Sequence, residues 1–372
     1  MSVSRRIQLA GVLAILTAPI TLAPAAAMAD AISDAKAFVE KYSAPNAPWT
    51  GPTTGPKAES GKSIVYVSTD QRNGGALGAG EGVKEAAGKI GWKFTLIDGQ
   101  GSVAGRSTAL DQAIASKPDV IVLGGVDATE QATAIQEAAK QGIVIVGWHA
   151  YAKSGPHDSL PIFTNITTDP LVVARAAASY PCAETGGKVG AVIFTDSTYE
   201  IALKKAHAME DVIKACGDSK VLEFVDTPLA DASTRMPQLT TSLLQRYGAS
   251  WTTSLSINDL TFDFMSPSFS AAGIDGKDNP QAISAGDGSE AAFQRIRQGD
   301  YQAATVAEPL HLQGWQIVDE ANRALHKEKD SGFVAPPHLF LATNIDHDGG
   351  PNNTYDPENG YQDAYMKIWG IK

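Results

Sequence analysis

A strand–turn–helix pattern repeats along most of this 372-residue chain and constrains its fold more than any other feature. The apolar runs are short, continuous and rich in valine and isoleucine, as in SIVYVST (63–69) and DVIVLGG (119–125). Such runs are typical of parallel sheets whose two faces are both covered, whereas half-exposed sheets alternate in polarity. Parallel strands also need crossover connections, and the intervening helical segments can supply them.

The pattern occurs in two consecutive blocks. In the first block we expect strands at 63–69, 93–98, 119–125, 143–148 and 162–167 and helices near 76–90, 106–116 and 129–141. In the second we expect strands at 188–195, 221–227, 251–259, 281–287 and 303–308 and helices near 199–215, 233–247, 260–272, 289–298 and 311–327. The sequence therefore predicts an α/β protein with two Rossmann-like units in tandem, each built on a parallel sheet.

Residues 1–29 have the pattern of a secretory signal peptide. An Arg-Arg pair precedes the apolar stretch 7–22, and small residues at 27–29 suit a cleavage site. No cysteine lies near this cut, since the first is Cys182, so nothing there can carry a lipid anchor. We expect a mature chain that begins at Asp30, has no membrane anchor and resides in the periplasm of a Gram-negative cell.

Residues 30–61 do not share the strand–helix pattern. A short helix is expected over 31–42, and the proline-rich segment 43–61 has no periodicity, which predicts an extended arm. Trp49 is the residue expected to hold this arm against the body of the protein.

Charge and cysteine content narrow the class of protein further. Without Arg5 and Arg6, 28 of the 30 basic residues remain against 41 acidic ones, a net charge of −13. Such a surface repels nucleic acid and anionic lipid, so neither is an expected partner. In an oxidising compartment two cysteines are more often a disulfide than a metal site or a nucleophile, so we expect Cys182 and Cys216 to be joined.

Polar side chains follow most of the expected strands at the point where each strand ends. Ligands of open α/β sheets bind outside the carboxyl ends of the strands. A single polar residue there is more often a helix cap or turn former, but their number favours a binding site. With two nearby polar residues added, the candidate ligand-binding residues are Ser68, Asp70, Gln71, Asn73, His149, Asn165, Tyr199, Asn258, Asp287 and Glu308.

Motifs for catalysis, cofactors and metals are missing. The glycines of GALGAG (75–80) do not follow the dinucleotide-binding order, and no His-Glu-x-x-His sequence occurs. Gly61-Lys62-Ser63 does not complete a Walker motif, because Pro56 stands where that motif has its first glycine. Asp287 and Glu308 could imitate a glycosidase pair, but carboxylates also accept hydrogen bonds from sugar hydroxyls or from an amine. The polar segment 346–358 suggests calcium, yet Pro351 occupies the position where an EF-hand loop needs glycine. We therefore expect no catalytic residue, cofactor or metal.

Four stretches resemble the type I periplasmic sugar-binding proteins of ABC importers, the ribose-binding-protein group. They are IVYVST with its glycine-rich turn, SIND (256–259), AGDG (285–288) and QGDYQAATVAEPLHLQGW (298–315). The resemblance covers residues 62–346, and it implies that Asn258 and Asp287 bind sugar hydroxyls.

The sequence also departs from ribose binders. Two aromatic residues usually follow the first strand, where this chain has Asn73-Gly74-Gly75. Glu308 replaces a glutamine, and an Asp-Arg pair is replaced by Trp148-His149. The family's arginine after the first strand of the second unit has no clear counterpart, although Tyr199, Lys204 and Lys205 lie nearby in the sequence.

The resemblance implies two lobes joined by a hinge that close on a ligand, formed by 62–166 plus 309–338 and by 167–308 plus 339–372. The function implied is capture of a sugar or polyol by a monomer, for delivery to the permease and ATPase subunits of an ABC importer. The alternatives are a binder of an amino sugar or another cationic small molecule, since Glu308 is acidic, and an exported sugar-cleaving enzyme. A regulator of the lac-repressor type would share the fold but would need a DNA-binding segment in place of the signal peptide.

Overall fold

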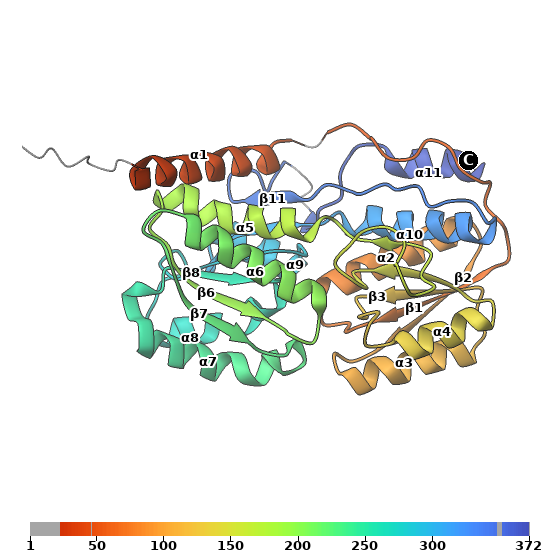
Figure 1. Ribbon diagram of the computed structural model, residues 1–372, viewed down its shortest axis with the longest axis horizontal. Helices are drawn as coiled ribbons and strands as arrows, with labels where there is room; N and C mark the ends of the chain where they lie inside the picture. Colours follow the sequence, from red (N-terminus) through yellow and green to blue (C-terminus); the bar gives the residue numbers. More distant parts are fainter. Residues whose placement is uncertain (1–22, 46, 348–351, 372) are drawn as a thin grey trace, which may run out of the picture.

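The computed structural model describes residues 23–45, 47–347 and 352–371, and within them the chain forms two α/β lobes side by side (Figure 1). Residues 1–22 of the expected signal peptide lie outside the described residues. No helix in the described part of the chain has both the length and the apolarity needed to cross a membrane.

The amino-terminal lobe contains a five-stranded sheet in the order β2-β1-β3-β4-β5, with every neighbouring pair parallel. Both of its faces are covered, which explains why β1 and β3 read as continuous apolar runs. The elements are β1 (Ser63–Ser68), α2 (Gly74–Lys89), β2 (Lys93–Asp98), α3 (Val103–Ala115), β3 (Val120–Gly124), α4 (Ala132–Lys140), β4 (Val144–Trp148) and β5 (Asn165–Ile166).

The carboxyl-terminal lobe contains a six-stranded sheet in the order β11-β10-β9-β8-β6-β7, in which only β11 runs antiparallel to its neighbour. The helical elements are α5 (Pro170–Thr185), α6 (Glu200–Ala215), η1 (Leu229–Asp231), α7 (Ala232–Tyr247), η2 (Gly248–Ser250), η3 (Leu260–Phe264), α8 (Ser266–Ala271) and α9 (Glu290–Gln298). The strands are β6 (Gly190–Thr195), β7 (Lys220–Asp226), β8 (Thr253–Ser256), β9 (Gln281–Ser284), β10 (Gln302–Ala307) and β11 (His338–Leu341).

The chain crosses between the lobes after β10. The next helix, α10 (Leu310–Leu325), packs against α2 of the amino-terminal lobe, and β11 then returns to the other sheet. Helix α11 (Tyr361–Trp369) lies on α10, where the rings of Trp369 and Trp315 stack with centroids 5.4 Å apart. The expected placement of all of 339–372 in the carboxyl-terminal lobe is therefore wrong for α11, because its aromatic side chains are buried against α10.

The segment before β1 contacts both lobes. Helix α1 (Ala23–Ser43) packs along α5, with the guanidinium of Arg175 over the ring of Phe38. Trp49 packs against Phe333 and Tyr365 of the amino-terminal lobe, in agreement with its expected role. The arm thus runs from one lobe to the other along one side of the molecule (Figure 1).

Cys182 in the last turn of α5 and Cys216 at the end of α6 form the expected disulfide. Both cysteines are fully buried and pack with Ala35 of α1. The bridge therefore joins α5, on which the amino-terminal helix rests, to the end of α6.

Candidate functional site

A cavity of about 60 Å³ lies between the lobes, at the carboxyl ends of the strands of both sheets. By this measure a single water needs roughly 10–15 Å³, so the cavity as it stands is small. It shares Asn73, Asn258 and Asp287 with a wider groove of about 600 Å³ that runs along the first turns of α2 and α9. The polar residues of the cavity wall are Thr69, Asp70, Asn73, Trp148, His149, Tyr199, Lys205, Asn258 and Asp287.

The lobes are in contact around this cavity. The hydroxyl of Tyr199, at the start of α6, hydrogen-bonds Thr69 at 2.9 Å and accepts from Arg106 at 2.6 Å, and both partners belong to the other lobe. The Arg106 guanidinium also lies over the Tyr199 ring. The backbone N–H of Glu200 donates to Asp127 across the same boundary. The structure is therefore a closed arrangement of the two lobes.

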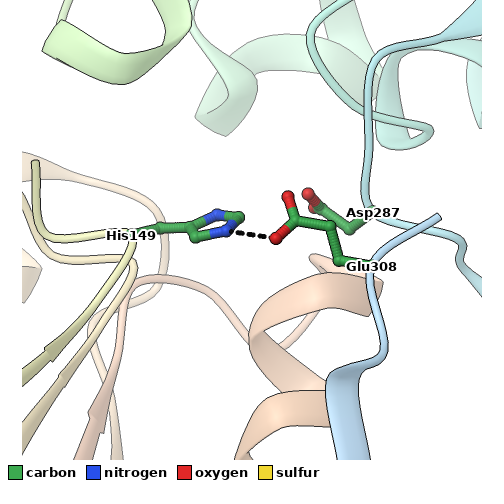
Figure 2. Close-up of side chains that lie close together, drawn as sticks. All are labelled: His149, Asp287 and Glu308. Atoms are coloured by element: carbon green, nitrogen blue, oxygen red, sulfur yellow. Dashed lines mark hydrogen bonds and ion pairs between the residues drawn. The ribbon is translucent and has the colours of Figure 1, made fainter. Parts of the chain in front are cut away.

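Asp287, which follows β9, lines the cavity from the carboxyl-terminal lobe, and its carboxylate lies beside that of Glu308 (Figure 2). It is 6% exposed, and within the described part of the chain no hydrogen bond reaches its carboxylate. Burial raises the pKa of Asp287 to about 6, although Lys205 and His149 oppose that shift and Glu308 adds to it. The carboxylate of Asp287 can therefore accept hydrogen bonds from a ligand.

Glu308, at the end of β10, lies close to Asp287 but is not part of the cavity wall. One oxygen, Oε2, accepts from Gln313 at 2.9 Å and from the Thr168 N–H, and it lies 3.0 Å from His149 Nε2 (Figure 2). Burial alone would raise the pKa of Glu308, but His149, Lys205 and Gln313 outweigh it and hold the pKa below its usual range. Glu308 is therefore an ionised group behind the wall.

The hydrogen-bond directions around Glu308 follow from its neighbours. The Trp148 indole N–H can only donate, and it donates to Gln313 Oε1 at 2.8 Å. The Gln313 amide nitrogen must therefore face Glu308 and Thr168. Because an ionised carboxylate only accepts, Nε2 of His149 carries the hydrogen toward Glu308. This network connects the amino-terminal lobe to the hinge.

His149 has φ of +50° and its ring stacks on Trp148, with centroids 4.0 Å apart and planes 7° from parallel. Histidine tolerates this left-handed backbone better than branched residues do. The pair forms a flat wall of the cavity.

Lys205 of α6 is the cation of the site. Its Nζ donates to the carbonyls of Ala285 and Ile257, and it lies 4.0 Å from Asp287 and 3.9 Å from Glu308. Lys204, by contrast, forms an exposed pair with Glu200. Lys205 was noted in the sequence as a neighbour of the missing arginine, and the structure places its side chain in the cavity wall.

Two buried oxygens near the cavity have no hydrogen-bond partner in the described part of the chain. They are Oδ1 of Asn258, in the cavity wall, and Oε1 of Glu308, the oxygen that does not bond His149. A buried acceptor without a donor costs roughly 1–3 kcal/mol, more when it is charged. Both residues are at least nine-tenths buried, so each has a buried oxygen that can still accept a hydrogen bond.

Besides Glu308, three of the expected site residues do not line the cavity. Ser68 and Gln71 hydrogen-bond each other, with 2.7 Å between Gln71 Nε2 and Ser68 Oγ. Asn165 accepts from the Ala150 N–H and donates to the carbonyls of Tyr151 and Lys153, so it holds the loop after β4. The side chains of all three residues therefore stabilise the local structure.

Two other expected residues line the wall while their side chains are already engaged. The carboxylate of Asp70 is paired with Arg72 at 2.7 Å. Asn73 caps α2 by accepting from the N–H groups of Gly75 and Ala76. Sequence reasoning overlooked Arg106, which lies inside a helix and looks like a surface residue until the lobes are placed together.

His149, Asp287 and Glu308 form a cluster whose ligand atoms lie within 4.8 Å of one another, as a metal site would require. The Lys205 ammonium, however, lies within 4.0 Å of both carboxylates and repels a divalent cation. Oε2 of Glu308 also already has three partners. The residues therefore do not fit a metal ion well.

Solved structures with the same fold come from ABC transporter solute-binding proteins. One from Agrobacterium vitis, bound with α-D-tagatopyranose, is 16% identical with a TM-score of 0.68, covering 79% of this chain and 99% of its own. A second from Agrobacterium vitis, with bound allitol, is 20% identical with a TM-score of 0.63, covering 77% and 97%. A third, from Bradyrhizobium sp. BTAi1 with bound bis-tris, is 17% identical with a TM-score of 0.61, covering 84% and 90%.

At these identities the likeness establishes the fold, a type I periplasmic binding protein with two lobes of parallel sheet. No curated protein sequence matches the chain. The model of the periplasmic binding protein domain matches residues 64–329, which is most of the chain and includes both lobes and the cavity between them. This chain therefore belongs to the periplasmic binding protein family.

Proposed function

We propose that this protein is an exported receptor that captures a small hydroxylated solute between its lobes and delivers it to an ABC importer. The observation that carries the proposal is the polar cavity at the strand ends, closed by contacts of Tyr199 with Thr69 and Arg106. Closure of two lobes around a solute is a known hinge motion of such receptors. The tagatose and allitol seen in the two Agrobacterium vitis proteins support a sugar or polyol.

Binding is favoured over catalysis by the position of the two carboxylates. A glycosidase needs both carboxyl groups beside the scissile bond. Here Asp287 lines the cavity, but Glu308 is 1% exposed, lies behind the wall and is bonded to His149 and Gln313. Glu308 is therefore poorly placed to exchange a proton with a bound sugar.

The partners and the location are part of the same proposal. The residues 1–29 would direct the chain to the periplasm, where the receptor, acting as a monomer, would meet a membrane permease with cytoplasmic ATPase subunits. The disulfide between Cys182 and Cys216 supports an oxidising compartment. Mass spectrometry of the periplasmic fraction should find a mature chain beginning at Asp30.

The binding function is tested by a thermal-shift screen of sugars, polyols and amines, because a ligand specific for the folded state raises Tm by mass action. We expect at least one compound to raise Tm in a concentration-dependent way, followed by calorimetry to obtain Kd. Release of a chromophore from aryl glycosides in the same panel would instead support the sugar-cleaving enzyme. Absence of any Tm shift across the panel would count against the receptor.

A further inference from the structure

From the unpaired acceptors of the cavity we infer that the captured solute carries a protonated amine beside its hydroxyl groups. This inference rests on the proposed receptor function and names the chemical class of its ligand. The polar wall offers two oxygen sites that await donors: the carboxylate of Asp287 and Oδ1 of Asn258. An ammonium group supplies three donors and no acceptor, which matches that need.

The charge balance of the buried cluster points the same way. Asp287 and Glu308 are two carboxylates, and Lys205 is the one ammonium within ion-pair distance of both in the described chain. Asp259 adds a further carboxylate nearby, whose Oδ2 accepts from the N–H groups of Gly288 and Ser289 and whose Oδ1 accepts from Gln302. Asp287, Glu308 and Lys205 together carry one net negative charge, and the His149 ring, 3.0 Å from Glu308, offsets it only in its protonated form. A ligand with a positive charge would offset it in either form of His149, whereas a neutral polyol would leave the balance to His149 alone.

Lys205 does not hydrogen-bond to the carboxylate of Asp287 or of Glu308. Its Nζ lies 2.7 Å from the Ala285 carbonyl, whereas the carboxylates are 3.9 and 4.0 Å away. Those distances permit attraction but exceed the range of a hydrogen bond. The Asp287 carboxylate is therefore free to accept from a ligand. Lys205 beside it repels a ligand ammonium less than a divalent cation, because the ammonium carries a single charge.

The cavity wall includes aliphatic side chains such as Leu229, Ile257 and Leu260, but it offers few aromatic faces for a neutral sugar ring. The loop after β1 contributes Asn73 to the wall, and Gly74 and Gly75 follow it without side chains. The stacked Trp148–His149 pair is a flat wall on one side, and the Tyr199 ring already faces Arg106. Recognition thus depends more on hydrogen bonds and charge than on stacking.

The experiment compares matched ligands that differ by one group. Isothermal titration calorimetry at pH 7.5 would measure three pairs of increasing size: serinol and glycerol, 1-amino-1-deoxysorbitol and sorbitol, and glucosamine and glucose. We expect the amine of at least one pair to bind at least about tenfold more tightly than its hydroxyl partner, the effect of one charge-assisted hydrogen bond.

Two variants identify the group responsible. Asp287→Asn should reduce the amine preference to near unity, with folding checked by circular dichroism and Tm. Asn258→Asp adds a carboxylate to the same wall and should increase the preference, so the inference stays testable if Asp287→Asn folds poorly.

The outcomes separate the ligand class from the receptor function. Neutral ligands that bind as tightly as their amine partners, or more tightly, would overturn the inference that the ligand carries an amine. They would still support the proposed receptor function. An amine preference that survives Asp287→Asn would also overturn the assignment to this site. Absence of binding by all six compounds would count against both.

Discussion

Asp287 and Glu308 follow adjacent strands, β9 and β10, and their environments give them opposite properties. Burial without hydrogen bonds raises the pKa of Asp287 to about 6, whereas His149, Lys205 and Gln313 hold the pKa of Glu308 below its usual range against burial. The ligand-free protein therefore contains one carboxylate that is stabilised as an ion and one that is not.

This difference predicts how stability depends on pH. The unfolded chain releases the Asp287 proton near pH 4, but the folded chain keeps it until about pH 6, so ionisation of Asp287 weakens the fold as pH rises through that window. Asp287→Asn removes the effect, worth on the order of 2–3 kcal/mol. Relative to wild type, the variant should gain stability between pH 4.5 and pH 7.5.

Urea unfolding at several pH values measures this gain. Asp158→Asn is the control, because Asp158 is 91% exposed and its side chain has little to gain or lose on folding. A difference between wild type and Asp287→Asn that is the same at every pH would contradict the raised pKa of Asp287.

The sequence could place both acids at strand ends but could not give the direction of their side chains. Glu308 turns behind the wall because Gln313, one helical turn later, and the Thr168 N–H both donate to it. The second of these donors is distant in sequence. For the same reason Asn165, expected to bind ligand, instead supports its own loop.

At the scale of elements, the first turn of α2 approaches the other lobe closely. A Cβ built on Gly75 would lie 2.4 Å from Oδ2 of Asp287, and one built on Gly74 would lie 2.6 Å from the Cβ of Ser289. Both distances are shorter than atoms tolerate, and the contacts are made across the cleft. The two glycines therefore permit the closed arrangement.

Gly75→Ala should hinder closure without harming the helix. We expect ligand affinity to fall by about tenfold or more, since the closed state becomes strained. Gly88→Ala is the matched control, because an added Cβ there meets nothing within 4 Å and lies on the exposed side of the same helix. The control should stabilise the protein by up to ~1 kcal/mol, as expected for Gly to Ala in a helix, and leave affinity unchanged. Equal affinities of the two variants would refute the role of Gly75.

The elements themselves were largely predictable, because strands such as β1 and β3 are buried on both faces and read as continuous apolar runs. The expected strand 162–167 is reduced to β5 (Asn165–Ile166), although the backbones of Phe163 and Thr164 also hydrogen-bond to β4. Helix α11 was missed although Tyr361, Tyr365 and Trp369 recur at helical spacing. Strand β11 was not predicted either, because it directly follows a Pro-Pro pair, which is typical of a loop.

At the scale of the whole molecule, the amino-terminal arm joins the lobes in addition to the hinge. Helix α1 rests on α5 of one lobe, while Thr54 and Pro56 of the arm accept from Arg323 and Asn322 of the other. The short stretch of chain between α1 and Thr54 must lengthen, or one of its ends must detach, before the lobes can separate widely. We expect the arm to limit the opening of the ligand-free protein.

This expectation is tested by lengthening the arm. A flexible Gly/Ser segment of about ten residues inserted after Ala47 should increase the radius of gyration of the ligand-free protein and leave that of the liganded protein unchanged. The same insertion after the exposed Gly273 is the control. Identical ligand-free dimensions for both insertions would show that the arm does not restrain the lobes.

Closure of the two lobes on a solute is the central claim, and small-angle X-ray scattering tests it most directly. The wild type should have a larger radius of gyration alone than with a saturating concentration of the tightest compound from the calorimetric panel. With that compound, its scattering curve should match the curve calculated from the closed arrangement held by Tyr199, Thr69 and Arg106. Scattering curves of wild type that are identical with and without the bound compound would contradict the account.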